Sequence, residues 1–288
     1  MTEDTPLRPD LGRFGVWLPT RSIEPDLAVR IESLGYGAIW VGGSPDADLA
    51  WVDPALAHTT SLKLATGIVN IWSAPAPAVA ESFQRIESAY PGRFLLGIGA
   101  GHREHTQTYA KPYHALESYL DELDAAAVPA GQRVLAALGP RVLRLAAQRS
   151  AGAHTYLVTP EHTAQARDLL GKAAFLAPEH KVVLSKDADE ARAIGRQALD
   201  PYLGLSNYVN NWLRLGFTDD DVRKPGSDRL IDAVVAHGTA EATAQRLQRH
   251  LQAGANHVAI QLLGTARGDE LVTSLGHLAQ ALGLAPAR

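Results

Sequence analysis

Apolar, β-rich runs recur along this chain, each followed by a stretch with helical periodicity, and this alternation constrains the fold more than any other feature. Eight such runs stand at 13–19, 38–43, 62–70, 93–101, 133–139, 153–159, 181–186 and 257–263. Several are continuously apolar rather than alternating, as expected for parallel strands covered on both faces. The alternation predicts a (β/α)8 TIM barrel, with a doubly wound open sheet as the alternative. No G-x-G-x-x-G motif follows the first run, which counts against that open sheet.

One spacing in this series is irregular. The seventh and eighth runs are about seventy residues apart, far more than one crossover helix needs. The excess, residues 202–238, has a helical and amphipathic pattern. It predicts either extra helices over the barrel mouth or a subunit contact, so a homodimer is one expectation. We expect a short loose arm over residues 1–12 and a single barrel domain over 13–288.

The composition restricts the partners and the compartment. The net charge is −4 and no basic block occurs, which argues against nucleic acid as a partner. The chain has 0 cysteines, which excludes disulfides and thiolate metal sites and favours the cytoplasm. The first ten residues are acidic and proline-rich, so they predict neither a signal peptide nor a membrane span. We therefore expect a cytoplasmic protein that acts on a small molecule.

Barrel chemistry lies where the strands end at their carboxyl side, so the residues after each run are the candidates. Ala100 and Gly101 end the fourth run, and His102 follows it. Small residues at this point allow a flat ring or a phosphate to approach the backbone. The alternative is a tight turn with solvated polar residues.

Gly139, Pro140 and Arg141 separate the fifth run from the helical stretch that follows. Proline is tolerated at a helix start because its missing N–H would be unpaired there in any case. The remaining free N–H groups and the helix dipole favour an anion, and Arg141 strengthens that preference. The pattern predicts a seat for a cofactor phosphate, with an ordinary helix start and a surface arginine as the alternative.

Three segments in this order resemble the bacterial-luciferase-like family: LATGIVNIWSAPAPAVAESF, GRFLLGIGAG and AALGPRVLRLAAQRSAGA. The likeness is greater to the family's oxidoreductases that use the deazaflavin coenzyme F420. Residues 181–199 and 238–263 are similar to its seventh strand with the following helix and to its last helix–strand unit. The resemblance implies an F420-dependent oxidoreductase that transfers hydride between the deazaflavin and a small organic substrate. An FMN-dependent luciferase-like monooxygenase and a non-redox phosphate-binding barrel remain as alternatives.

The resemblance also implies which residues hold the cofactor. Family members place the ring against the third strand, often at a non-proline cis peptide, and the matching bond here is Gly67–Ile68. We expect that bond to be cis or strongly strained. The implied cofactor-binding residues come from three turns and are Gly67, Ile68, Asn70, Ala100, Gly101, His102, Ala137, Leu138, Gly139, Pro140, Arg141 and Val142.

The chain departs from the family pattern after the second strand. Some F420 enzymes carry an Asp-His pair there, whereas this chain has Gly42 and Gly43. The proton that accompanies hydride transfer then needs another donor, and His102 and His105 are the nearest candidates. We expect the substrate pocket to include Gly42, Gly43 and Trp72, with plain packing as the alternative for the tryptophan.

The histidines do not predict a metal site. His102 and His105 have no third ligand at a fitting spacing and no H-E-x-x-H motif, so we expect no metal. Four other histidines fall beside the ends of predicted elements, and we expect them at the surface: His154, His162, His237 and His250.

Overall fold

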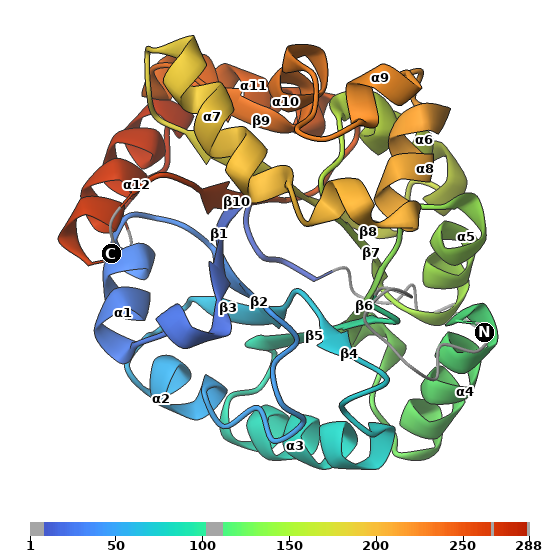
Figure 1. The fold of residues 1–288 in the computed structure, drawn as a ribbon. Helices are drawn as coiled ribbons and strands as arrows, with labels where there is room; N and C mark the ends of the chain where they lie inside the picture. The colour runs from blue at the N-terminus through green and yellow to red at the C-terminus, as the bar shows by residue number, and fades with distance from the viewer. Residues whose placement is uncertain (1–8, 102–111, 266–267, 287–288) are drawn as a thin grey trace.

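The computed structural model describes residues 9–101, 112–265 and 268–286, which alternate between strands and helices (Figure 1). The strands are β1 (Phe14–Pro19), β2 (Ala38–Gly42), β3 (Lys63–Thr66), β4 (Val69–Asn70), β5 (Phe94–Gly99), β6 (Arg133–Ala136), β7 (Gly152–Thr155), β8 (Phe175–Val183), β9 (Val235–His237) and β10 (Val258–Leu262). The α-helices are α1 (Pro25–Ser33), α2 (Val52–Ala57), α3 (Ala76–Ala89), α4 (Pro112–Ala125), α5 (Pro140–Arg149), α6 (Pro160–Leu170), α7 (Ala188–Leu199), α8 (Ser206–Arg214), α9 (Asp219–Val222), α10 (Asp228–Val234), α11 (Ala240–Gln252) and α12 (Asp269–Leu282). Short 3-10 helices include η1 (Thr20–Ser22), η3 (Ala130–Gln132) and η4 (Tyr202–Gly204).

The strands close into a parallel barrel surrounded by helices, which confirms the predicted (β/α)8 fold (Figure 1). The circuit runs β1, β2, β3, β5, β6, β7, β8, β10 and returns to β1. In the closing pairs, Val16 lies opposite Ile260, and Ile260 lies opposite His180. Because every pair in the circuit is parallel, the carboxyl ends of the strands meet at one mouth.

The third barrel strand is interrupted before it reaches the mouth. β3 ends at Thr66 and β4 begins at Val69, and the Gly67–Ile68 peptide between them is cis, as predicted. The Thr66 hydroxyl accepts a hydrogen bond from the Gly97 N–H at 2.7 Å and donates to the Gly97 carbonyl at 2.8 Å. A Cβ at Gly97 would stand 1.9 Å from the Thr66 carbonyl oxygen, so only glycine fits there. Side-chain hydrogen bonds therefore hold the interrupted strand against β5.

The seventh barrel strand begins earlier than the sequence pattern predicts. β8 spans 175–183 rather than 181–186. Its side chains Glu179 and Lys181 are charged and yet buried, and Pro178, Glu179 and His180 break the apolar run before Lys181, where the predicted strand begins. The strand pairs with β7 at its start and with β10 and β9 toward its end. Similarly, the run predicted at 153–159 is a strand only as far as Thr155.

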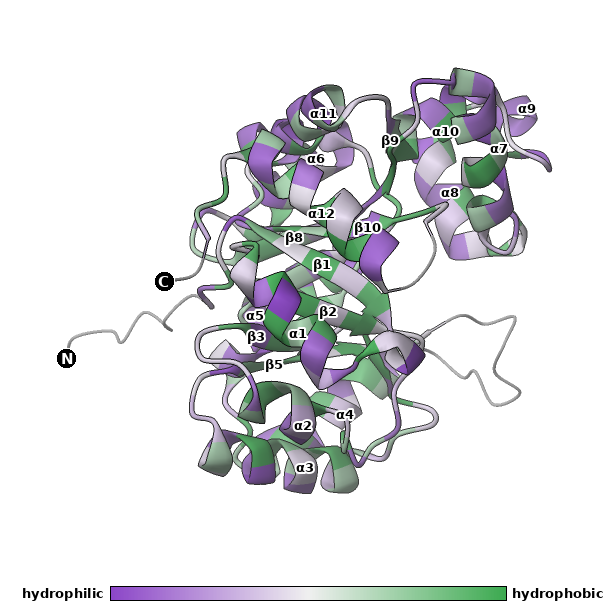
Figure 2. Ribbon diagram, turned by 90° about the vertical axis from the view of Figure 1, so that its left-hand side faces the viewer, coloured by the Kyte–Doolittle hydropathy of each residue, from purple (hydrophilic) through white to green (hydrophobic). Residues whose placement is uncertain are grey.

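Residues 202–238 form extra helices at one side of the barrel mouth, and Tyr202, Asn207 and Tyr208 line the cavity there. They form η4, α8, α9, α10 and β9, and Figure 2 shows α8–α10 beyond one end of the barrel. β9 pairs with β8 outside the barrel circuit, with Val235 opposite Lys181. Trp212 of α8 is buried and its indole N–H donates to the Leu157 carbonyl at 3.1 Å. We call this segment the roof.

The packed part of the chain begins before residue 13. Leu11 is buried, and the Gly12 carbonyl accepts a hydrogen bond from His257 Nδ1 at 2.8 Å. The end of the expected loose arm is therefore part of the barrel, because its apolar leucine joins the core. Residues 1–8 lie outside the described residues. Across the part of the chain that is described, no helix combines the length and hydropathy needed to cross a membrane.

Three of the four histidines predicted at the surface are buried. His154, His162 and His250 are each at most a few per cent exposed, and only His237 is partly exposed. The prediction was wrong because it assumed that residues at the ends of helices and strands are exposed to solvent. In a barrel these ends lie under the surrounding helices or face the interior.

Candidate functional site

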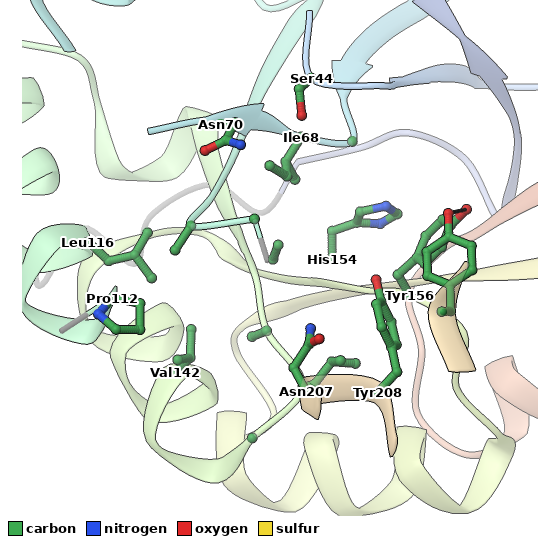
Figure 3. A pocket seen from close by; sticks show the side chains of 18 of the residues that line it. Ser44, Ile68, Asn70, Pro112, Leu116, Val142, His154, Tyr156, Asn207 and Tyr208 are labelled. Carbon is green, nitrogen blue, oxygen red and sulfur yellow. Dashed lines mark hydrogen bonds between the residues drawn. The ribbon is translucent and has the colours of Figure 1, made fainter. Parts of the chain in front are cut away.

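The carboxyl ends of the strands surround a cavity of about 690 Å³ (Figure 3). Most of the predicted site residues line it, namely Gly43, Gly67, Ile68, Asn70, Ala100, Gly101, Ala137, Leu138, Gly139, Arg141 and Val142. Three predicted residues are not among the lining residues: Gly42, Trp72 and Pro140. The predicted proton donors His102 and His105 lie outside the described residues.

One wall of the cavity comes from β4 and the end of β5. The Ile68 side chain packs over Gly99, where a Cβ would stand 2.8 Å from Ile68 Cγ1. Asn70 packs against Gly101, whose φ is +60° and where a Cβ would stand 2.8 Å from Asn70 Nδ2. The neighbouring side chains therefore leave little room for a side chain at either glycine.

Trp72 supports this wall without lining the cavity. Its indole N–H donates to the Ala100 carbonyl at 2.7 Å, and its backbone N–H donates to Asn70 Oδ1 at 3.1 Å. The hypothesis that Trp72 forms the substrate wall is thus replaced by a supporting role. Its hydrogen bonds fix the position of the turn at Ala100.

A second wall comes from the start of α5. Gly139 is the N-cap residue and no side chain caps the helix, so the first N–H groups are available to a ligand. Pro140 is exposed at the first helical position, as its missing N–H allows. The Arg141 guanidinium lies 4.3 Å from the ring centre of Tyr113, and both side chains line the cavity. The helix dipole and Arg141 together make this end of the cavity suitable for a phosphate.

The place of the missing Asp-His pair is taken by an indole. A Cβ at Gly42 would stand 1.7 Å from Trp17 Cζ2, so the glycine is required by the tryptophan that lies over it. Trp17, on β1, lines the cavity in its stead. Gly43 follows with φ +88° and lines the cavity beside Ser44.

His154 of β7 presents its imidazole to the cavity (Figure 3). Its Nδ1 lies 2.8 Å from the Ala177 carbonyl oxygen, and its ring stacks on Trp40 with 4.2 Å between the ring centres. Burial lowers the pKa of His154 to about 4, against the opposing effect of the Ala177 hydrogen bond. The imidazole is therefore neutral at neutral pH.

Tyrosine side chains form the side of the cavity that faces the roof. Tyr156, Tyr202 and Tyr208 line it, and the hydroxyls of the first two lie 3.2 Å apart. Lys181 Nζ donates to the Tyr156 hydroxyl at 2.8 Å and to Glu179 Oε1 at 3.0 Å. Burial raises the pKa of Glu179 and lowers that of Lys181, while their mutual attraction opposes both shifts. The ion pair thus fixes the tyrosine wall without lining the cavity itself.

The sequence pattern missed Trp17, His154 and the tyrosines. The available signal was the two-residue period of a strand, since side chains two apart point to the same face. His154 and Tyr156 stand two apart at the end of one strand, and both reach the cavity. Trp17 occupies an inward position of β1 in the same way.

Residues 13–127 match the family model of luciferase-like monooxygenases, and the predicted resemblance is confirmed. An F420-dependent glucose-6-phosphate dehydrogenase of Nakamurella multipartita is 31% identical over 104 aligned residues. That alignment covers 31% of this chain and 31% of the relative, so the two are compared over less than a third of their lengths.

Solved structures share the fold over nearly the whole chain. An F420-dependent secondary alcohol dehydrogenase in complex with an F420-acetone adduct has a TM-score of 0.71 at 16% identity, with 94% of this chain and 98% of that chain covered. The oxygenating constituent of 3,6-diketocamphane monooxygenase from Pseudomonas putida, in complex with FMN, has a TM-score of 0.66 at 14% identity, with 96% and 99% covered. At these identities the likeness establishes the fold.

Proposed function

Since residues 13–127 match the luciferase-like monooxygenase family, we propose that this chain is an oxidoreductase that binds coenzyme F420 and transfers hydride between it and a small organic substrate. The observation that carries the proposal is the cavity at the barrel mouth, which has the cis Gly67–Ile68 peptide on one wall and the uncapped start of α5 on another. The F420-dependent relative supports the choice of cofactor.

The described residues fit a long cofactor with a flat ring and a phosphate. Arg141 and the free N–H groups of α5 suit the phosphate. A Cβ at Gly67 would fill a space that is bordered by Trp17 Nε1 and His154 Nε2, so glycine keeps this part of the wall open. When bound, the deazaflavin supplies the hydride chemistry, and the protein orients the substrate and excludes water.

FMN is the second candidate cofactor, because a structural neighbour is in complex with FMN. The phosphate seat at α5 would serve either molecule. We prefer F420 because the curated relative is F420-dependent.

A titration of the purified protein with F420, FMN and glucose 6-phosphate tests the proposal. We expect saturable quenching of the deazaflavin fluorescence with F420, and weaker binding of FMN. Binding of FMN that is tighter than that of F420 would instead favour the FMN-dependent monooxygenase. Binding of the sugar phosphate without either cofactor would favour a non-redox barrel.

Arg141→Ala tests the phosphate seat. The loss of a charge-assisted hydrogen bond should weaken F420 binding by roughly 1.5–3 kcal/mol, or about 10–150-fold in Kd. The matched control is Arg144→Ala, because Arg144 is exposed on the same helix and does not line the cavity. Equal Kd values for the two variants would place the phosphate elsewhere.

We further propose that the protein works in the cytoplasm, because its sequence contains 0 cysteines and therefore has no use for an oxidising compartment. A homodimer also remains a proposal. Light scattering coupled to gel filtration measures the oligomeric state directly.

A further inference from the structure

Two buried nitrogens in the cavity wall have no hydrogen-bond partner within the described residues: Trp17 Nε1 and His154 Nε2. Their side chains are 8% and 2% exposed. Both nitrogens lie beside Gly67, where a Cβ would stand 3.0 Å from Trp17 Nε1 and 3.3 Å from His154 Nε2. The two nitrogens therefore flank the same point of the cavity wall, beside Gly67. An unpaired buried polar atom is costly, so this arrangement points to a ligand that satisfies the pair.

The two nitrogens have opposite hydrogen-bonding roles. An indole N–H can only donate. His154 Nδ1 faces the Ala177 carbonyl at 2.8 Å and must carry the proton there, which leaves a lone pair on Nε2. The wall therefore offers one donor and one acceptor side by side.

A hydroxyl group matches this pair, because its oxygen accepts from Trp17 while its proton is donated to His154. A carbonyl oxygen would satisfy the indole but would face the imidazole lone pair. Among the described lining residues Arg141 is the one charged side chain, and it lies at the start of α5. The part of the cavity next to Gly67 therefore suits an uncharged ligand.

On the basis of the proposed function, we infer that the substrate is a small uncharged alcohol and that His154 takes its hydroxyl proton. The O–H bond breaks and the proton passes to His154 Nε2. The carbinol C–H bond breaks with its electron pair, which leaves as hydride to the oxidised deazaflavin, and the C=O bond forms. The alcohol is oxidised to a carbonyl compound and the deazaflavin is reduced. Trp17 holds the oxygen throughout.

This assignment explains the departure from the family pattern after the second strand. Gly42 leaves room for Trp17, so no side chain from that position reaches the reacting group. The imidazole comes instead from His154, on β7.

The test compares His154→Phe and Trp17→Phe with a control, His250→Gln, which alters a buried histidine that does not line the cavity. F420 binding is measured by fluorescence, and F420 reduction by the loss of its visible absorbance, with 2-propanol, cyclohexanol, 1-phenylethanol and glucose 6-phosphate as probes. His154→Phe should lower kcat by ~10²–10⁴ while the Kd for F420 changes less than about threefold. Trp17→Phe should mainly raise KM, by about 5–10-fold. His154→Gln serves if the phenylalanine variant does not fold.

A second readout does not depend on turnover. The chain has 5 tryptophans, so the indole N–H region of a ¹⁵N spectrum holds few signals, and the signal lost in Trp17→Phe identifies Trp17. Cyclohexanol should shift that signal, and His154→Phe should weaken the titration at least tenfold. Cyclohexanone should bind more weakly than cyclohexanol.

The outcomes separate this inference from the proposed function. Failure to bind F420 would refute the proposed function and the inference with it. F420 binding without any response to the alcohols, turnover of glucose 6-phosphate instead, or an unchanged kcat in both His154 variants would overturn the inference alone.

Discussion

Acid should weaken this fold through His257, which lies just before β10. Its Nε2 accepts a hydrogen bond from Trp40 Nε1 at 3.0 Å, and its Nδ1 donates to the Gly12 carbonyl at 2.8 Å. The contact with Trp40 requires an unprotonated Nε2, and burial lowers the pKa of His257 to about 4 against the opposing effect of the Gly12 hydrogen bond. In the unfolded chain the pKa of a histidine is about 6.5. Below that pH the unfolded state binds a proton that the folded state does not, so stability falls as the pH falls.

The magnitude follows from these two pKa values. At pH 7.5 the histidine is neutral in both states and contributes no pH dependence. At pH 5.0 it is protonated in the unfolded chain and still neutral in the folded one, which lowers the free energy of unfolding by about 2 kcal/mol. The loss occurs between pH 6.5 and pH 4 and is complete below the folded pKa.

Urea unfolding at pH 7.5 and pH 5.0, followed by tryptophan fluorescence, measures this loss. His257→Gln will be less stable at both pH values, so the quantity compared is the change between them. That change should be smaller in the variant by about 2 kcal/mol. Other titrating groups, such as Glu179, are common to both proteins and cancel. If parent and variant lose the same free energy, His257 does not have the lowered pKa and the argument from its burial is wrong.

Two further substitutions test the packing around the cavity. Gly42→Ala should push the Trp17 indole aside and lower the free energy of unfolding, measured by thermal unfolding, by about 1–3 kcal/mol. The control is Gly204→Ala, where no atom lies within 4 Å of the new Cβ, and its loss should be far smaller. Equal losses of stability in the two variants would contradict the packing argument. Lys181→Met should destabilise the protein by about 3–5 kcal/mol in urea unfolding, because it leaves the Glu179 carboxylate buried without its cationic partner. Adding Glu179→Gln should recover much of this stability. A double variant no more stable than Lys181→Met would show that the lost ion pair is not the cause.

The sequence predicted the barrel and part of the cavity because both depend on local patterns. Continuous apolar runs identified most strands, and the Gly-Pro-Arg turn identified the start of α5. β8 was placed too late because Glu179 has the character of a surface residue until Lys181 is recognised as its partner. That pairing is visible in the sequence only once the face of the strand is known.

Trp17 and His154 could not be found in this way. They come from β1 and β7, which are separated by two strands of the circuit, and both lie beside Gly67 only once the circuit is closed. Neither residue belongs to a recognisable sequence motif, and each could equally be an ordinary buried residue. The expected donors His102 and His105 were chosen because they follow a strand, and they stay predictions since they lie outside the described residues.

The attachment of the roof has a consequence for how such an enzyme could diversify. The roof follows α7 and ends in β9, which pairs with β8, so it is one contiguous stretch of the chain. It supplies Asn207 and Tyr208 to the cavity, while the phosphate seat belongs to α5. On the proposed function, mutation or exchange of this stretch would change which molecules fit the cavity without altering the residues proposed to bind the cofactor phosphate. If the proposed function holds, substrate choice and cofactor binding depend on separate segments of the chain, which can evolve at different rates.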